Sequence, residues 1–143
     1  MLYEECISGG LKMTVQRRII ADCLDEADDH PDVDAIYRRA VEKDSSVSIA
    51  TVYRTIGIFE KAGLIQPIDI VDSNKRYEVK RERHDHLVDV ETGQIHEFKS
   101  PSIENLVREI ALEMGFDVSD FQLQVYGSKV GGKECPCYRI KVY

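Results

Sequence analysis

The sequence lacks the features of a membrane or secreted protein. No apolar run approaches the roughly 18 residues that a membrane span needs, and residues 1–5 lack the basic start of a secretion signal. Internal repeats and low-complexity stretches are also missing. The four cysteines show no disulfide framework, and a reducing cytosol would keep them as thiols or metal ligands. We therefore expect a cytoplasmic protein without a membrane partner.

Positive charge is also scarce. The chain has 19 lysines and arginines against 26 aspartates and glutamates, which gives a formal net charge of −7. This balance argues against indiscriminate binding to nucleic acid. It leaves room for a specific DNA-binding protein, because basic residues need only line the contact face. The length of 143 residues suits one ordinary domain or two small ones that share a core with a partner, so it is compatible with a dimer.

Three helices are predicted for the first half of the chain. Thr14 is a candidate N-cap for a helix that ends near Ala27, and Asp32 is a candidate N-cap for the second. The third begins at Ser48 and has a natural C-cap in Gly63. The apolar residues at helical spacing are Val15, Ile19, Ile20, Cys23 and Leu24, then Val33, Ile36, Tyr37, Ala40 and Val41, then Ile49, Val52, Ile56 and Phe59. We expect these residues to form the core.

A β-hairpin is predicted after the third helix. Residues 64–70 and 76–79 read as two strands, with a turn at Asp72–Asn74 between them. Three helices and a two-stranded wing form the layout of a winged helix-turn-helix, in which the last helix enters the major groove of DNA.

The second half of the chain predicts a separate small domain. A charged run at 80–83 without apolar period indicates a linker, so we expect a DNA-binding domain over residues 1–82 and another domain over 83–143. Residues 86–90 and 94–98 are predicted strands, and a helix with apolar residues between Ile103 and Met114 follows Pro101.

Residues 118–126 alternate like a further strand, with Phe121, Leu123 and Val125 inward. A second copy of the chain would cover the edges of so small a sheet. The expected fold class is α+β, with an N-terminal winged helix-turn-helix followed by a small α/β dimerisation domain.

A potential metal site centres on His84 and His86. Residues i and i+2 of a strand project to the same face, so both imidazoles can bind one ion. Glu78 precedes the pair, Glu97 follows it, and His30 could bring the first domain to the same ion. Three imidazoles and two carboxylates exceed the usual tetrahedral zinc set and suit Fe²⁺ or Mn²⁺. Zinc would still often occupy the site in purified protein, because it lies higher in the divalent affinity series.

Other interpretations of these residues compete. A lone histidine is usually packed or solvated, and we interpret His96 in this way because it faces the opposite side of its strand from Glu97. A metalloenzyme could use a His-x-His pair, but catalysis needs an open coordination position, and five protein ligands leave little room for one. We therefore expect no enzyme. A dimeric scaffold with a fortuitous metal site remains as an alternative, and it would bind DNA without regard to metal.

The outer face of the third helix carries the candidate base contacts. Its members are Ala50, Thr51, Tyr53 and Arg54. Arg54 could bind guanine O6 and N7, and Tyr53 or Ala50 could pack on a thymine methyl. The helix pattern alone favours an ordinary surface helix with an arginine that extends into solvent, but the hairpin that follows favours DNA recognition.

Basic residues at or before the first helix are candidates for contact with phosphates or the minor groove. They are Lys12, Arg17 and Arg18.

Four segments resemble the ferric uptake regulator family of metal-dependent repressors. They are Gly10–Arg17, Ala50–Thr55, His84–Leu87 and Ile95–Phe98, and the similarity runs from about Gly10 to Tyr126. The resemblance implies a homodimer that binds a double-stranded DNA operator, an A·T-rich palindrome, and represses genes for the uptake of metal, with iron as the first candidate. By position, it places one regulatory divalent ion per chain on the same five residues, His30, Glu78, His84, His86 and Glu97.

The resemblance leaves alternatives within the family open. Zinc or manganese could be the sensed ion. Peroxide-sensing relatives favour aspartate where this chain has Glu97, which favours metal sensing here. A Cys-Pro pair can also ligate haem, so Cys135-Pro136-Cys137 keeps a haem-responsive regulator as a lesser alternative, although we expect free thiols.

Two metal sites of relatives are not matched. Many members carry a Cys-x-x-Cys that forms half of a structural zinc site, where this chain has Asp89 and Thr92, so we expect no structural zinc.

A second site in many relatives uses two histidines, an aspartate and a glutamate. This chain keeps Asp85 and Glu104 but has Arg83 and Phe121 at the histidine positions. Arginine brings positive charge and phenylalanine offers no lone pair, so this site should bind metal poorly.

Overall fold

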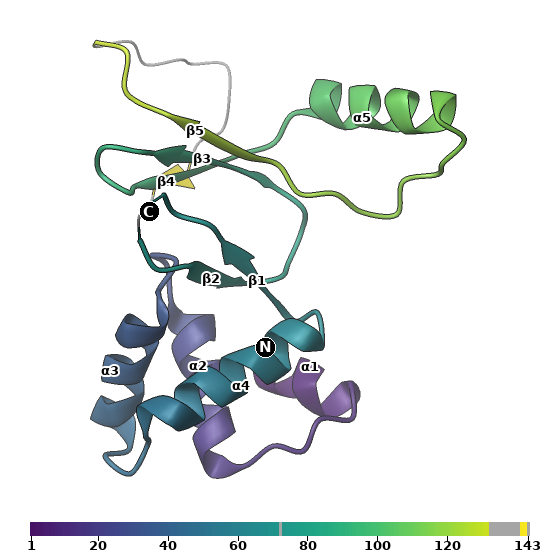
Figure 1. The fold of residues 1–143 in the computed structure, drawn as a ribbon. Coiled ribbons are helices and arrows are strands. Elements are labelled where there is room, and N and C mark those ends of the chain that lie inside the picture. Colours follow the sequence, from purple (N-terminus) through teal and green to yellow (C-terminus); the bar gives the residue numbers. More distant parts are fainter. Residues whose placement is uncertain (72, 132–140, 143) are drawn as a thin grey trace. The chain divides into compact units, whose positions relative to one another are not determined.

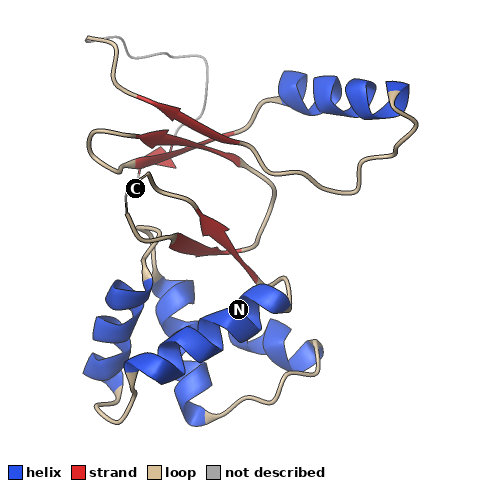
Figure 2. Cartoon of the chain, viewed as in Figure 1, coloured by secondary structure: helices blue, strands red, loops and turns tan. Residues whose placement is uncertain are grey.

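The computed structural model describes residues 1–71, 73–131 and 141–142. The chain divides into two compact units, Met1–Glu82 and Arg83–Tyr143, which contain helices and short strands in both halves of the sequence (Figure 2). Within the described residues, no helix combines the length and the apolar character that crossing a membrane requires.

The first unit consists of four helices followed by a two-stranded antiparallel hairpin (Figure 1). The elements are α1 (Leu2–Ser8), α2 (Val15–Glu26), α3 (Val33–Lys43), α4 (Ile49–Lys61), β1 (Ile65–Ile68) and β2 (Arg76–Val79). The three predicted N-caps are confirmed, because the side chains of Thr14, Asp32 and Ser48 each accept a hydrogen bond from the first turn of their helix. Asp72 of the predicted turn lies outside the described residues.

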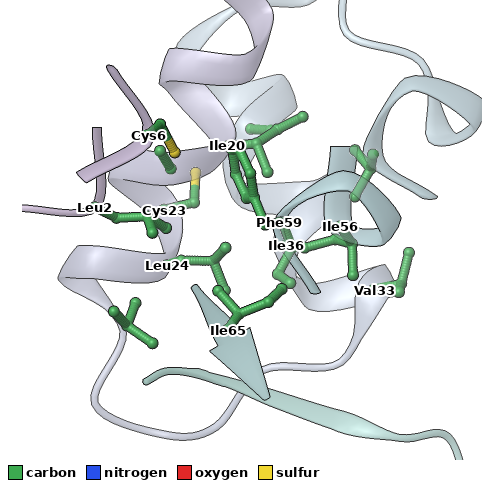
Figure 3. Close-up of a cluster of buried hydrophobic side chains, with 14 of the residues drawn as sticks. Leu2, Cys6, Ile20, Cys23, Leu24, Val33, Ile36, Ile56, Phe59 and Ile65 are labelled. Carbon is green, nitrogen blue, oxygen red and sulfur yellow. The ribbon is translucent and has the colours of Figure 1, made fainter. Parts of the chain in front are cut away.

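The core of this unit forms where α1, α2, α3, α4 and β1 meet (Figure 3). Val52, Ile56 and Phe59 of α4 are buried as predicted. Two predicted core residues are exposed, Val15 at 73% and Ile49 at 38%, and Ile19, Tyr37 and Val41 are only partly buried. Each of the two exposed residues is the first residue of its helix, and its side chain leans toward the helix N-terminus, beyond the packed turns.

Helix α1 was not predicted from the sequence. Its Leu2 and Cys6 are fully buried against the rest of the unit. The backbone N–H of Leu2 donates a 2.8 Å hydrogen bond to Asp25 Oδ2, and Arg81 Nη2 lies 3.3 Å from Asp25 Oδ1. The sequence signal for this helix was two apolar residues four positions apart, and so short a pattern does not predict a helix. Asp25 therefore joins α1, α2 and the charged segment after β2.

Ion pairs fix the connection between α2 and α3. Arg39 donates hydrogen bonds of 2.9 and 2.5 Å to the two carboxylate oxygens of Asp29. This bidentate contact holds the pKa of Asp29 below its usual range. Lys43 donates to Glu26 at 2.7 Å, which raises the pKa of Lys43. The loop that holds His30 is thus attached to α3 on one side.

The second unit is a small sheet with one helix beside it. The sheet has the strand order β5-β3-β4-β6, and β3 pairs antiparallel with β4 and parallel with β5. Its elements are β3 (Asp85–Asp89), β4 (Ile95–Phe98), α5 (Pro101–Glu113), β5 (Gln124–Gly127) and β6 (Lys141–Val142). The side chains of Val88 and Ile95 are buried within this unit. The predicted α+β class is confirmed.

The predicted strand over 118–126 is wrong in its first part, because only Gln124–Gly127 is a strand. In the preceding backbone, the carbonyl of Val118 accepts from Arg108, and the N–H of Phe121 donates to Asp120. Only next to the strand does the carbonyl of Leu123 accept from the N–H of His86 in β3. Phe121 and Leu123 are half-buried, but Val125, expected inward, is 36% exposed.

Helix α5 buries none of its residues within the chain. Figure 1 shows it to one side of the strands of its own unit instead of across their face. Its exposed apolar residues and those that follow it are Leu106, Ile110, Leu112, Met114 and Phe116. The apolar face predicted between Ile103 and Met114 is therefore present, and among the described residues nothing buries it.

Removal of the Asp25 carboxylate should destabilise the first unit. We expect Asp25→Ala to lower the free energy of unfolding by about 1–2 kcal/mol, because the Leu2 N–H loses its acceptor in a partly buried setting. Urea denaturation monitored by circular dichroism measures this loss. Asp25→Asn keeps a carbonyl acceptor and should lose less. Equal stability of Asp25→Ala and the parent protein would contradict the role assigned to Asp25.

The Asp29–Arg39 pair should contribute stability that depends on pH. The pKa of Asp29 is lowered in the folded state, so its contribution is present above the unfolded value, near pH 4, and is lost as the pH falls through the folded value. At pH 7, Asp29→Asn should cost only about 0.5–1 kcal/mol, because both side chains are partly exposed. Urea unfolding at pH 7 and below pH 4 tests this, with Asp28→Asn as the exposed control. A cost for Asp29→Asn that stays constant down to pH 3 would contradict the assignment.

Candidate functional site

The first unit brings together one imidazole and one carboxylate, which we name the first ligand group (His30 and Glu78). His30 Nε2 lies 2.8 Å from Glu78 Oε2, and the two side chains are 3% and 11% exposed. Glu78 comes from β2, and His30 comes from the loop between α2 and α3. A nitrogen and an oxygen donor thus converge in a largely buried position of this unit.

The backbone at His30 is held in an unusual conformation. Its φ of 48° lies in the left-handed region, which residues other than glycine adopt at a cost. The His30 carbonyl accepts a 3.2 Å hydrogen bond from Arg76, and the Pro31 carbonyl accepts one of 2.9 Å from the Tyr77 N–H. Both donors belong to β2. The wing therefore fixes the loop that presents the imidazole.

Glu78 is also fixed through its second oxygen. Gln66 of β1 lies directly opposite Glu78 in the hairpin, and its amide nitrogen donates to Glu78 Oε1. Sequence reasoning missed Gln66 and Arg76 as partners of the ligand residues. The register of the hairpin, which the sequence does not give, is the information that would have identified Gln66.

The second unit holds the second ligand group (His84, His86 and Glu97). His86 of β3 is paired directly with Glu97 of β4, and a nitrogen of His86 lies within 4.8 Å of a Glu97 oxygen. His84 Nε2 lies 3.3 Å from Glu97 Oε1. The two imidazole rings are 4.7 Å apart between centroids and stand edge to face. Because β3 begins at Asp85, His84 precedes the strand on which it was expected.

These donor groups have the chemistry of a site for a transition-metal ion. Imidazole nitrogen and carboxylate oxygen bind Fe²⁺, Mn²⁺ and Zn²⁺, and the carboxylates supply charge that matches a cation. The side chains of His84, His86 and Glu97 are at most 16% exposed, so bulk water competes little with them as ligands. His96 is opposite Leu87 in the sheet and alternates away from Glu97, as its sequence position predicted.

The candidate base contacts lie on the exposed side of α4. Tyr53 is 60% exposed, Ala50 and Arg54 are exposed, and the buried residues of the helix lie on its other side. Thr51 is half-buried, and its hydroxyl lies 2.9 Å from the hydroxyl of the N-cap Ser48. Thr51 therefore helps to cap α4, which the sequence pattern did not indicate.

The basic residues near α2 differ in their roles. Arg17 donates a 2.6 Å hydrogen bond to the backbone carbonyl of Lys12, so it supports the segment before α2. The Lys12 side chain is exposed. Gln16 donates to Ser46, which ties the start of α2 to the loop before α4. These contacts connect the segment of Lys12, through the start of α2, to the loop before α4.

Asp89 closes the turn between β3 and β4. Its Oδ1 accepts from the N–H groups of Glu91 and Thr92 at 2.9 and 3.4 Å, and the bond from Glu91 lowers the pKa of Asp89. Gly93 follows with a φ of 72°. Asp89 and Thr92, at the positions of the cysteine pair of relatives, thus stabilise a turn. Cys135 and Cys137 lie outside the described residues.

Comparison with known proteins places this arrangement in a family. The model of the ferric uptake regulator family matches residues 8–126. A ferric uptake regulation protein of Rhizobium leguminosarum is 50% identical over 127 residues, which cover 88% of this chain and 89% of that protein. A zinc-bound manganese uptake regulator is 48% identical, with a TM-score of 0.68 over 90% of this chain and 98% of that chain.

A ferric uptake regulator of Pseudomonas aeruginosa with manganese is 34% identical and has a TM-score of 0.81 over 90% of this chain and 98% of that chain. Two His/Glu groups, a helix with an exposed Tyr-Arg pair and a family match over most of the sequence agree with one another. The chain belongs to the ferric uptake regulator family, whose members are transcription regulators and not enzymes.

Proposed function

We propose that this protein is a metal-dependent repressor, which binds a DNA operator as a homodimer when one divalent ion per chain is bound. The observation that carries the proposal is the presence of a largely buried His/Glu group in each unit. A purely structural role for both groups would not require five side chains with nitrogen and oxygen donors at these places.

The ion is Fe²⁺ or Mn²⁺ in this proposal, and it is bound by His30, Glu78, His84, His86 and Glu97 together. Three nitrogens and two oxygens suit the five or six coordination positions that these ions accept, and zinc would bind in purified protein. The names of the similar proteins refer to ferric uptake and to manganese uptake, which supports both ions. The proposal includes no structural zinc, because Asp89 and Thr92 take part in a turn.

The five residues would couple metal to DNA through the two units. His30 and Glu78 belong to Met1–Glu82, and His84, His86 and Glu97 belong to Arg83–Tyr143. When both ligand groups bind one ion, the chain segment between Glu78 and His84 loses conformational freedom. The DNA-binding units of a dimer then keep the spacing that fits two half-sites about one helical turn apart, or a multiple of it.

The exposed face of α4 and the segment at Lys12 would make the DNA contacts. Arg54 can bind a guanine edge in the major groove, and Tyr53 and Ala50 can pack on thymine methyl groups. Lys12 would reach the minor groove of an A·T-rich operator, while Arg17 and Thr51 support the contact segments. With a net charge of −7, the chain confines its attraction to DNA to this surface.

A second copy of the chain would cover the apolar side of α5. Ile110, Leu112, Met114 and Phe116 are 50%, 65%, 69% and 67% exposed, which is more apolar surface than a soluble domain ordinarily leaves bare. Helix α5 contributes no buried residue to its own chain, so its amphipathic sequence needs a partner. A symmetric dimer through this unit would place two DNA-binding units on one operator.

Loss of a ligand should abolish the response to metal. We expect His86→Ala and Glu97→Gln each to weaken metal binding by at least about 100-fold, because loss of a residue that only hydrogen-bonds to a ligand already costs about 10–100-fold. Both variants should also lose metal-dependent operator binding. Anaerobic fluorescence anisotropy with Fe²⁺, Mn²⁺ and Zn²⁺ in turn measures the operator affinity. It also shows which ion acts at the lowest free concentration.

The matched control for the ligand variants is His96→Ala. His96 lies on the same sheet but alternates away from Glu97, so its removal should leave the metal response unchanged. Circular dichroism and size-exclusion chromatography verify that each variant keeps its fold and its oligomeric state. If His86→Ala still bound the operator with the metal dependence of the parent protein, the assigned ligand set would be wrong.

Arg54 should determine base preference and Lys12 should not. We expect Arg54→Ala to cost about 1–3 kcal/mol of specific affinity and to relax the preference at one base of each half-site. Lys12→Ala should weaken binding to A·T-rich sites and reduce its salt dependence. The measurement is metal-loaded binding to specific and scrambled duplexes at several salt concentrations. Arg38→Ala on the exposed side of α3 is the control. If Arg54→Ala bound both duplexes as Arg38→Ala does, the proposed base recognition by α4 would be refuted.

A further inference from the structure

Two different groups occupy the two sides of the chain from Arg83 to His86. Alternate residues of an extended chain project to opposite faces, so Arg83 and Asp85 share one side while His84 and His86 share the other. The side with the histidines carries the second ligand group. The side with Arg83 contains a carboxylate, Asp85, that is completely buried. Such a carboxylate requires a positive partner within the fold.

Arg83 supplies that positive charge and connects three segments of the second unit. Its Nη2 lies 2.6 Å from Asp85 Oδ1, and its Nη1 lies 2.8 Å from Glu104 Oε1 at the start of α5. The guanidinium carbon lies 3.6 Å from the centre of the Phe121 ring, which it covers. One side chain, 23% exposed, thus holds β3, α5 and the segment before β5 together. We name this set the Arg83 cluster (Arg83, Asp85, Glu104 and Phe121).

The residues of the Arg83 cluster do not fit a metal ion. Asp85 and Glu104 could each offer an oxygen, but both already bond to the guanidinium that lies between them. Arginine has no lone pair to donate and stays protonated at any pH the folded protein experiences, and the Phe121 ring offers no ligand atom. A cation entering this place would have to displace the guanidinium and leave it partly buried without a counter-charge. The second metal site of relatives is therefore closed in this chain.

We propose that Arg83 is a permanent cation that does the structural work of a metal ion and positions the segment from Arg83 to His86, whose other side carries His84 and His86. Helix α5 has no buried residue, and the ion pair between Glu104 and Arg83 attaches it to the segment that leads into β3. The guanidinium is part of the chain and cannot leave the protein as a metal ion can. This attachment therefore persists when metal is scarce. The part of the proposal that concerns His84 and His86 rests on their proposed role as metal ligands. The chain then has one exchangeable cation and one fixed cation on opposite sides of this short segment.

The first experiment measures thermal unfolding of the full chain in excess EDTA, where no ion contributes. We expect Arg83→Met to lower the melting temperature by about 5 °C or more, because it leaves the Asp85 carboxylate buried without a partner. Arg108→Met is the matched control, since Arg108 lies on α5 but donates an exposed hydrogen bond to the Val118 carbonyl. Glu104→Gln is a milder variant that keeps the fold and should give a smaller decrease of the same sign. Unchanged melting of Arg83→Met and Glu104→Gln in EDTA would overturn the proposal.

The second experiment counts the ions bound and measures their affinity with Co²⁺, whose absorption reports its ligands. Glu104→Gln should leave the number of Co²⁺ ions per chain unchanged, because Glu104 holds a guanidinium and not a metal. It should nevertheless weaken Co²⁺ binding several-fold, since β3 is held less firmly, while Arg108→Met should not. A Glu104→Gln protein that lost one ion per chain would show a metal site at this place and overturn the proposal. If the parent protein bound no Co²⁺ but the melting differences in EDTA persisted, the fixed cation would stand and the proposed function would fail.

Discussion

The need to match buried carboxylates with positive charge is the constraint on which this structure depends. The chain has 26 acidic residues against 19 basic ones, and a carboxylate removed from water without a partner costs several kcal/mol. Asp25 and Asp85 are matched by arginines, Arg81 and Arg83, whose charge is permanent. Glu78 and Glu97 face imidazoles, whose charge is not permanent. Imidazole nitrogens and carboxylate oxygens placed together in this way are suited to receive an exchangeable cation.

Local chemistry explains which elements could be predicted from the sequence. The helix starts at Thr14, Asp32 and Ser48 follow from a side-chain oxygen that accepts from the first turn, an effect that needs no tertiary contact. Predictions failed where distant residues decide the outcome. Helix α1 depends on Asp25 for its first N–H group, and the backbone carbonyl of Val118 accepts a hydrogen bond from Arg108 of α5 instead of joining a strand. Periodicity contains neither of these contacts.

The convergence of the proposed ligand residues could be predicted from alternation along a strand, but the contacts that support them could not. A His-x-His spacing places His84 and His86 on one side of the chain, and the pairing of His86 with Glu97 follows once β3 and β4 form a hairpin. The partners that orient His30 and Glu78 depend on the register of another hairpin and on a left-handed residue in a loop. Gln66 and Arg76 could be recognised as partners of these residues only after the register of the hairpin and the conformation of the loop were known. Their hydrogen bonds hold Glu78 and the loop of His30 in place.

The alternation of Arg83, His84, Asp85 and His86 separates two functions that metal ions would otherwise share. If both faces of β3 were held by ions, falling metal would loosen the sheet and release the sensing ligands together, and stability and response would be coupled. A guanidinium on one face removes that coupling, because its bonds to Asp85 and Glu104 do not depend on metal concentration. In the proposed mechanism only the histidine face then responds to metal. A regulator built in this way could lose its ion without losing the strand that must bind the next one.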